Sequence, residues 1–229
     1  MDPREQAYTG ISIQVSLSGY SFKIAGPAGT VCSGWKRAEH LFTTPEFQRR
    51  YDTVDISLLT PKVALVPEGF FSPEQARQAL AEVIALKEGD FVESVSVPAF
   101  ASVLLYSNSI GESLSKVLSQ TVLPASGVPV RVLPEMYYLL QEVSQVGEYN
   151  KILASWCDET LHLVIAQGRS LCLANTFRAP DFTTAEYFLF LAMKRLQLNP
   201  EVSTVCFRTP LSQEAEMSLY RYFKAVVRL

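Results

Sequence analysis

The chain has 229 residues, of which 48% are hydrophobic and 19% are charged, and its net charge is −3 at neutral pH. This composition supplies enough apolar side chains for a sizeable core and excludes global disorder. A net charge this close to zero provides no strong basic field, so we expect no nucleic-acid partner. The length suits one large domain or two lobes of about 100 residues each.

The termini, the apolar runs and the cysteines favour a cytoplasmic protein. The first six residues contain no apolar segment of a secretory signal. The longest apolar runs, 99–106 and 187–193, are far shorter than the roughly 20 residues of a membrane span. The cysteines lack C-x-x-C spacing and lie in apolar segments, which indicates reduced, buried thiols and neither disulfides nor a zinc site. They are Cys32, Cys157, Cys172 and Cys206.

Residues 11–35 predict a meander of three short strands. Apolar and polar residues alternate over 11–17 and again over 20–24, which is the period of a half-buried strand. The glycines of segments 18–19 and 26–29 predict the two tight turns. The other elements expected before residue 71 are a short helix at 46–51 and strands at 54–59 and 63–66.

The middle of the chain is expected to open with an amphipathic helix. Ser72 and Gln75 form a capping box at its start, and Lys87 and Gly89 suit its end. Its apolar stripe carries Ala76, Ala79, Leu80, Val83 and Ile84. The next expected elements are strands at 92–97 and 100–106, a helix capped by Ser109 with Glu112, a strand at 128–132 and a helix opened by Pro134.

Residues 150–177 repeat the pattern of the opening meander. Three strands are expected there, with turns at Asp158-Glu159 and around Gly168. Thr183 and Glu186 predict the cap of the helix that follows. The chain is then expected to end with a strand at 202–208 and a helix from Ser212, whose apolar face carries Leu219, Phe223, Val226 and Val227.

The two meanders correspond at an offset of about 140 residues, in strand lengths and turn positions more than in side-chain identity. Tyr20, Phe22 and Ile24 of the first match Leu161, Leu163 and Ile165 of the second. We therefore expect two halves: residues 1–147, which hold an inserted middle segment, and residues 148–229.

This plan resembles the actin-like ATPase superfamily, in which a three-strand meander followed by helix, strand and helix occurs twice. Segments 95–98 and 128–135 resemble the linker of its type IV pilus assembly proteins. Nearly the whole chain resembles a Bacteroidetes family of unknown function, domain-of-unknown-function family 3822. The matching motifs are S-I-x-V-S-x-x-G-x-S-F from Ser12 to Phe22 and L-V-P-E-x-x-F from Leu65 to Phe71.

The resemblance implies an α/β fold of two ribonuclease-H-like halves, with mixed sheets that each start with a three-strand antiparallel meander. It also implies where nucleotide would bind. Actin-like ATPases place an Asp and a Gly in the hairpin turn of each half, where backbone N–H groups hold phosphate and the Asp organises magnesium.

Neither turn of this chain has the full set. The first, with Ser16, Ser18 and Gly19, has a glycine and no carboxylate, and the second, with Asp158 and Glu159, has carboxylates and no glycine. No Gly-Gly pair occurs in the chain. We treat these five residues as vestigial phosphate-loop candidates, expect no catalytic residue, metal or cofactor, and leave weak binding of ATP with magnesium open.

No other group of residues in the sequence predicts a catalytic site. His162 alternates with strand residues and is expected on a sheet face or at the surface, and His40 lies in a connection, so neither predicts a catalytic base. The helix at 183–197 is apolar almost all round at 187–193, which predicts burial or a partner surface.

The sequence therefore favours a catalytically inactive pseudo-ATPase that binds a protein or peptide in the cytoplasm. The alternative is a divergent nucleotide-binding enzyme of the ATPase or kinase class, acting through Asp158 or Glu159. A homodimer through the 183–197 helix is a third hypothesis. The identity of the partner is left open.

Overall fold

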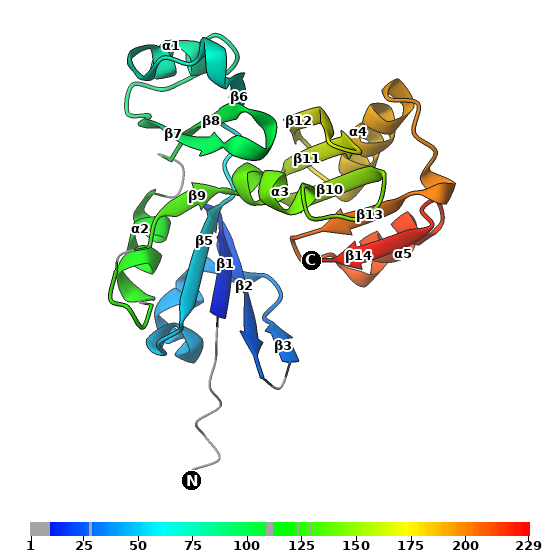
Figure 1. Cartoon of the computed structure of the whole chain (residues 1–229). Helices are drawn as coiled ribbons and strands as arrows, with labels where there is room; N and C mark the ends of the chain where they lie inside the picture. The colour runs from blue at the N-terminus through cyan, green and yellow to red at the C-terminus, as the bar shows by residue number, and fades with distance from the viewer. Residues whose placement is uncertain (1–9, 28, 109–111, 123, 129) are drawn as a thin grey trace. The chain divides into compact units, whose positions relative to one another are not determined.

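A computed structural model describes residues 10–27, 29–108, 112–122, 124–128 and 130–229. The chain packs as two compact units. Unit 1 consists of residues 1–59 and 110–133, and unit 2 consists of residues 60–109 and 134–229. Figure 1 shows the course of the chain through both.

The main sheet of unit 1 has the strand order β3-β2-β1-β5-β9, with β4 on β2. The first two strands pair antiparallel, and β5 lies parallel to β1 on its other side. Alternation explains the strands, because Ile11, Ile13 and Val15 are all buried. The strands are β1 (Gly10–Val15), β2 (Gly19–Gly26), β3 (Gly29–Cys32), β4 (Lys36–Arg37), β5 (Thr53–Leu58) and β9 (Val132–Pro134).

Short helices complete the core of unit 1. The aromatic ring of Phe47 lies 5.2 Å from that of Tyr20 and 5.5 Å from that of Phe22, between centroids. The expected helix at 46–51 is a 3-10 helix that ends earlier, and the strand expected at 128–132 starts only at Val132. The cap expected at Ser109 lies outside the described residues. The helices are η1 (Ala38–Thr43), η2 (Pro45–Gln48) and α2 (Glu112–Thr121).

The main sheet of unit 2 repeats this arrangement. Its order is β12-β11-β10-β13-β14, a meander followed by a strand parallel to the first. The strand order of the two sheets is the same, which explains the repeated pattern in the sequence. The strands are β10 (Asn150–Cys157), β11 (Thr160–Gln167), β12 (Ser170–Arg178), β13 (Thr204–Phe207) and β14 (Ala225–Arg228).

Three helices pack with this sheet: α3 (Glu135–Val143), α4 (Phe182–Arg195) and α5 (Gln213–Tyr220). Ser212 caps α5 as expected, but the cap of α4 is Asp181 and not Thr183. The prediction that the last helix continues through Val226 and Val227 was wrong, because those residues form β14, parallel to β13. Alternation in such a short run fits a strand better than a helical face.

A third sheet, β6-β8-β7, belongs to the segment inserted after β5. Leu80, Val103 and Leu105 form its own small core. The helix expected from residue 72 is much shorter, and Ser72 does not cap it, because its hydroxyl bonds the Glu74 carboxylate, 2.6 Å away. Val83, expected on the apolar stripe, is 67% exposed. The elements are β6 (Val63–Pro67), η3 (Glu68–Phe70), η4 (Pro73–Gln75), α1 (Ala76–Ala81), β7 (Val92–Val97), η5 (Pro98–Phe100) and β8 (Ser102–Ser107).

The compact units do not follow the linear order of the repeat. The insertion and α3 pack within unit 2, although both precede residue 148 in the sequence. The halves 1–147 and 148–229 therefore stay a prediction about the repeat. Within the described ranges, no helix is both long enough and apolar enough to span a membrane.

Candidate functional site

The first candidate site is the turn between β1 and β2, which holds Ser16, Ser18 and Gly19. The turn closes through the amide of Ser16, which donates to the carbonyl oxygen of Gly19 at 2.9 Å. The hydroxyls of Ser16 and Ser18 lie 3.4 Å apart, so the two predicted residues contact each other. Leu17, at the tip, is 67% exposed.

Gly19 is needed for the close approach of β4. A Cβ at this position would lie 2.0 Å from the carbonyl oxygen of Lys36 and 3.1 Å from the indole nitrogen of Trp35. The carbonyl of Ser18 also accepts a hydrogen bond from the amide of Ala38, at 3.2 Å. Gly19, the turn glycine that was expected to approach phosphate, therefore packs against the backbone of Lys36 in the same unit.

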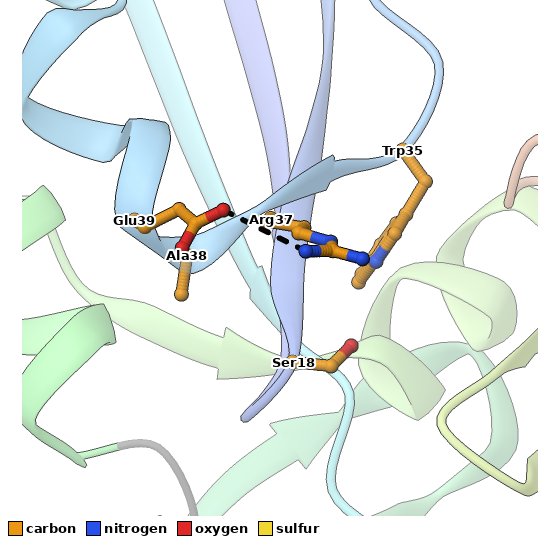
Figure 2. A pocket seen from close by; sticks show the side chains of 5 residues that line it. All are labelled: Ser18, Trp35, Arg37, Ala38 and Glu39. Carbon is orange, nitrogen blue, oxygen red and sulfur yellow. Dashed lines mark ion pairs between the residues drawn. The ribbon is translucent and has the colours of Figure 1, made fainter.

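An open hollow of about 560 Å³ lies beside this turn, lined by Ser18, Trp35, Arg37, Ala38 and Glu39. Figure 2 shows the Arg37 side chain between those of Glu39 and Trp35, with the Ser18 hydroxyl directed toward them. The charged groups of Arg37 and Glu39 are 3.8 Å apart and mostly exposed, so their attraction is strongly screened by water. The hollow combines an aromatic face, one cation and one anion.

Sequence reasoning missed Trp35, Arg37 and Glu39 because segment 31–35 was interpreted as a regular strand. In the structure β3 ends at Cys32, and the two-residue β4 pairs with the start of β2. A tryptophan followed by two basic residues was the available signal, since such a cluster is unusual on a half-buried strand.

The second candidate site is the turn between β10 and β11, formed by Asp158 and Glu159. Both residues have positive φ, 45° and 56°, as a two-residue hairpin turn requires. The carbonyl of Glu159 accepts from the amide of Ala179 at 2.6 Å, and its carboxylate lies 3.4 Å from the exposed guanidinium of Arg178. Two carboxylates at one tip would repel the oxygens of a phosphate.

Trp156 closes the base of this second turn. Its indole N–H donates to the carbonyl of Ala179 at 3.0 Å, and its ring packs edge-on against Phe182 with centroids 5.3 Å apart. Its own amide donates to the hydroxyl of Thr209 at 2.8 Å. Trp156 therefore belongs to the packing of unit 2.

The residues present do not fit the magnesium nucleotide that the fold implies. The first turn has no carboxylate to organise a metal, and the second has no glycine, while the guanidinium of Arg178 beside it already pairs with Glu159. Among the described residues, no three metal-ligating side chains come together. We therefore derive no phosphoryl-transfer step.

A buried ionisable cluster lies between α3 and the second sheet, two residue pairs from the turn at Asp158 and Glu159. The hydroxyl of Ser155 and the guanidinium of Arg208 both donate to the carboxylate of Glu135, at 2.6 and 2.7 Å. His162 pairs across the strands with Ser155, is fully buried, and contacts the carbonyl of Thr60 through Nε2 at 2.9 Å. His162 thus lies on a sheet face, as expected, and it is closed to substrate.

Burial sets the charge states in this cluster. Burial lowers the pKa of His162, against the opposing effects of the Thr60 carbonyl, the Glu135 charge and the Ser155 backbone. For Arg208, burial acts to lower the pKa, but the carboxylates of Glu135 and Glu142 outweigh it and raise the pKa above its usual value. The cluster therefore holds a neutral imidazole beside a buried ion pair. Such an arrangement has a role in the fold and offers no reactive group to a substrate.

Comparison with known proteins gives the family and the fold. The model of the family described as protein of unknown function (DUF3822) matches residues 1–226. A protein of Bacteroides thetaiotaomicron, described as having an actin-like ATPase fold and unknown function, is 18% identical over 100% of this chain and 93% of its own, with a TM-score of 0.69.

A structure described as the PilM-PilN type IV pilus biogenesis complex contains a second similar chain. It is 13% identical over 99% of this chain and 89% of its own, with a TM-score of 0.53. No curated protein sequence matches the chain. At these identities the structures show the fold alone, which is the actin-like ATPase fold expected from the repeated meander.

Proposed function

Because the chain belongs to the DUF3822 family and has the actin-like ATPase fold, we propose that it is a non-hydrolysing pseudo-ATPase that acts as a cytoplasmic scaffold for a protein or peptide. The observation that carries the proposal is the packing of Gly19 against the backbone of Lys36. In an ATPase of this fold, the same turn would present its backbone N–H groups to phosphate.

The second turn supports the proposal independently. Asp158 and Glu159 bring two negative charges to a position where a nucleotide would bring more. Catalysis of phosphoryl transfer depends on groups that neutralise the developing charge, whereas the exposed guanidinium of Arg178 at this turn already pairs with Glu159. A scaffold that keeps the fold without this chemistry is consistent with both turns.

A protein partner is favoured by the relatives and by the surface. One protein of similar fold is described as part of the PilM-PilN complex, and hence as a chain that assembles with another protein. Fold similarity alone is a weak argument for function. This chain also exposes large apolar side chains on α4, α5 and η3, among them Tyr187, Met217 and Phe70.

Thermal unfolding with and without 5 mM Mg-ATP, followed by a phosphate-release assay, tests the proposal. A ligand at 100 times its dissociation constant adds about 2.7 kcal/mol to the free energy of unfolding. We expect no shift and no release above a protein-free blank. Phosphate release that disappears in Asp158→Asn would overturn the proposal, because it would assign catalysis to the second turn.

Nucleotide binding without hydrolysis is the second candidate, and the hollow beside Ser18 favours it. Trp35 offers a ring on which a base could stack, and Arg37 offers a cation for a phosphate. If this candidate is right, Mg-ATP stabilises the protein and Arg37→Glu removes the effect. Arg50→Glu is the matched control, because it makes the same charge change at an exposed residue of unit 1 outside the hollow.

A further inference from the structure

A groove of about 330 Å³ lies between β12 and α4, within unit 2. From β12 it is lined by Leu173, Asn175 and Phe177, whose spacing of two places them on one face of the strand. From α4 it is lined by Phe188, Leu191 and Arg195, which form one stripe along the helix. Figure 1 shows α4 beside this strand.

The groove has an aromatic end and a cationic end. Phe177 and Phe188 stack with ring centroids 4.8 Å apart and an angle of 18° between the rings. Arg195 lies two helical turns farther along α4, and its guanidinium has no ion pair within the part of the chain that the structure describes. A ligand that fills the groove would therefore meet aromatic rings at one end and a free cation at the other.

The strand that forms one wall is the edge of its sheet. β12 pairs with β11 on one side, and among the strands that the structure describes none of its sheet lies on the other side. Between Ser170 and Phe177 it carries no charged side chain and no proline. In its pairing with β11 the strand bulges at Cys172, so its edge is regular only from Leu173 onward. Native proteins usually protect an edge with charges, prolines or bulges, and the regular stretch after the bulge has none of these, so it is open to an added strand.

Part of this edge is already in contact with the insertion. The hydroxyl of Thr176 donates to the carbonyl of Pro61 at 3.0 Å. The open and regular part of the edge therefore runs from Leu173 to Asn175. At about 3.3 Å per residue, this length pairs with roughly three residues of a segment in extended conformation.

We propose that the groove between β12 and α4 binds an extended segment of a partner protein, which adds a strand to the edge, places alternate apolar side chains on the groove floor and directs a carboxylate at Arg195. Strand addition of this kind takes its affinity from the main chain and its specificity from alternate side-chain pockets. The inference rests on the proposed scaffold function and names the chemistry of its partner.

A second copy of this chain fits the groove less well. Two β12 edges paired around a two-fold axis would each present the segment 170–177, which contains no aspartate or glutamate. Both copies of Arg195 would then stay without a carboxylate from the added strand. Charge complementarity therefore favours a different protein that carries an acidic residue next to alternating apolar residues.

Selection from a phage-displayed library of random linear dodecapeptides on the immobilised protein tests the inference. We expect enriched peptides that alternate apolar residues and carry an aspartate or glutamate at one end. Arg195→Glu should weaken their binding at least tenfold, and replacing the peptide's acidic residue by lysine should restore binding to that variant. Lys194→Glu, at an adjacent exposed residue outside the groove, is the matched control and should have little effect.

Two further measurements test the apolar floor and the strand pairing. Leu191→Asp should abolish binding, whereas Met217→Asp, on the exposed face of α5, should not. Circular dichroism and a thermal unfolding curve check that both variants are folded. Methylating the backbone nitrogens of the selected peptide one at a time should weaken binding at every second position, because alternate amides of an added strand face β12.

The outcomes are distinct. Peptides that bind equally well to Arg195→Glu and Leu191→Asp would overturn the groove and leave the scaffold function standing. No enriched peptide at all would overturn the groove, and phosphate release dependent on Asp158 would overturn the scaffold function separately. A dimer in sedimentation equilibrium that Leu191→Asp dissociates would assign the groove to a second copy and contradict the inference.

Discussion

The guanidinium of Arg208, at the end of β13, lies 2.7 Å from the carboxylate of Glu135, a residue at the start of α3 with no exposed surface. The pair joins α3 to the carboxyl end of β13, which is an inner strand of the second sheet. The Ser155 hydroxyl also donates to the carboxylate of Glu135, at 2.6 Å. The Nε–H of Arg208 donates to the carboxylate of Glu142, at 2.8 Å.

Removing one partner of this buried ion pair should lower the free energy of unfolding. In Arg208→Met the carboxylate of Glu135 stays buried without a counter-charge, so we expect the free energy of unfolding to fall by about 3 to 5 kcal/mol. The double variant Arg208→Met with Glu135→Gln should recover much of the loss. Urea unfolding of the wild type, both single variants and the double variant measures the coupling. Equal losses in Arg208→Met and the double variant would contradict the expectation.

The buried His162 should make stability depend on pH. Burial lowers its pKa in the folded state from the ordinary value of 6.5, so the unfolded chain binds more protons near that pH. The stability that the neutral imidazole supplies is therefore fully present above pH 6.5 and is lost as the pH falls below it, by at most about 1.4 kcal/mol per pH unit.

Urea unfolding at pH 5.5 and 7.5 measures the effect of His162. The difference between the two pH values should be smaller in His162→Gln than in the wild type, because the variant lacks the buried imidazole. An unchanged pH dependence in His162→Gln would show that this group has the same pKa in both states.

Gly19→Ala should destabilise unit 1, because its new Cβ would lie 2.0 Å from the carbonyl oxygen of Lys36. Backbone on both sides of the contact has to shift, and overpacking of this kind typically costs about 1 to 3 kcal/mol. Gly89→Ala is the control, since a Cβ there meets no atom within 4 Å. Thermal unfolding of both variants decides the point, and equal melting temperatures would mean that β4 does not hold its place against β2.

The start of α4 offers a direct comparison between two residues. The carboxylate of Asp181 accepts from the amide of Thr184 at 2.7 Å, and this bond lowers the pKa of Asp181. Asp181→Ala should lower the melting temperature, whereas Thr183→Ala should leave it almost unchanged. The loss should also appear in the wild type when the pH falls through the depressed pKa of Asp181. A larger effect from Thr183→Ala would restore the cap expected from the sequence.

The regular strands of the fold were predictable because their side chains alternate on a half-buried sheet. The segment from Ile152 to Ile165 has this period over two strands joined by a two-residue turn, and both strands form as expected. The actin-like fold was implied by the resemblance of the repeated meander to the plan of the actin-like ATPase superfamily, and the solved structures confirm it. Short elements were not predictable, because runs such as Ala225–Arg228 satisfy both a helical and an extended pattern.

The candidate site was only partly predictable. The sequence identified Ser18 and Gly19 as turn residues, but the role of Gly19 depends on the carbonyl of Lys36, which is close to it only in the folded sheet. The groove between β12 and α4 was also missed as a site, although the apolar helix 183–197 predicts either burial or a partner surface. Its lining comes from two elements, and neither one alone indicates a cavity.

The chain passes between its two compact units at residues 59/60, 109/110 and 133/134, so its first sheet is completed late during synthesis. β5 reaches its neighbour β9 only after the ribosome has translated the whole insertion. At roughly 5 to 20 residues per second, that interval lasts roughly 4 to 15 seconds. During it, β5 is an uncovered edge of a nascent sheet, so newly made chains expose an aggregation-prone strand that the finished protein hides.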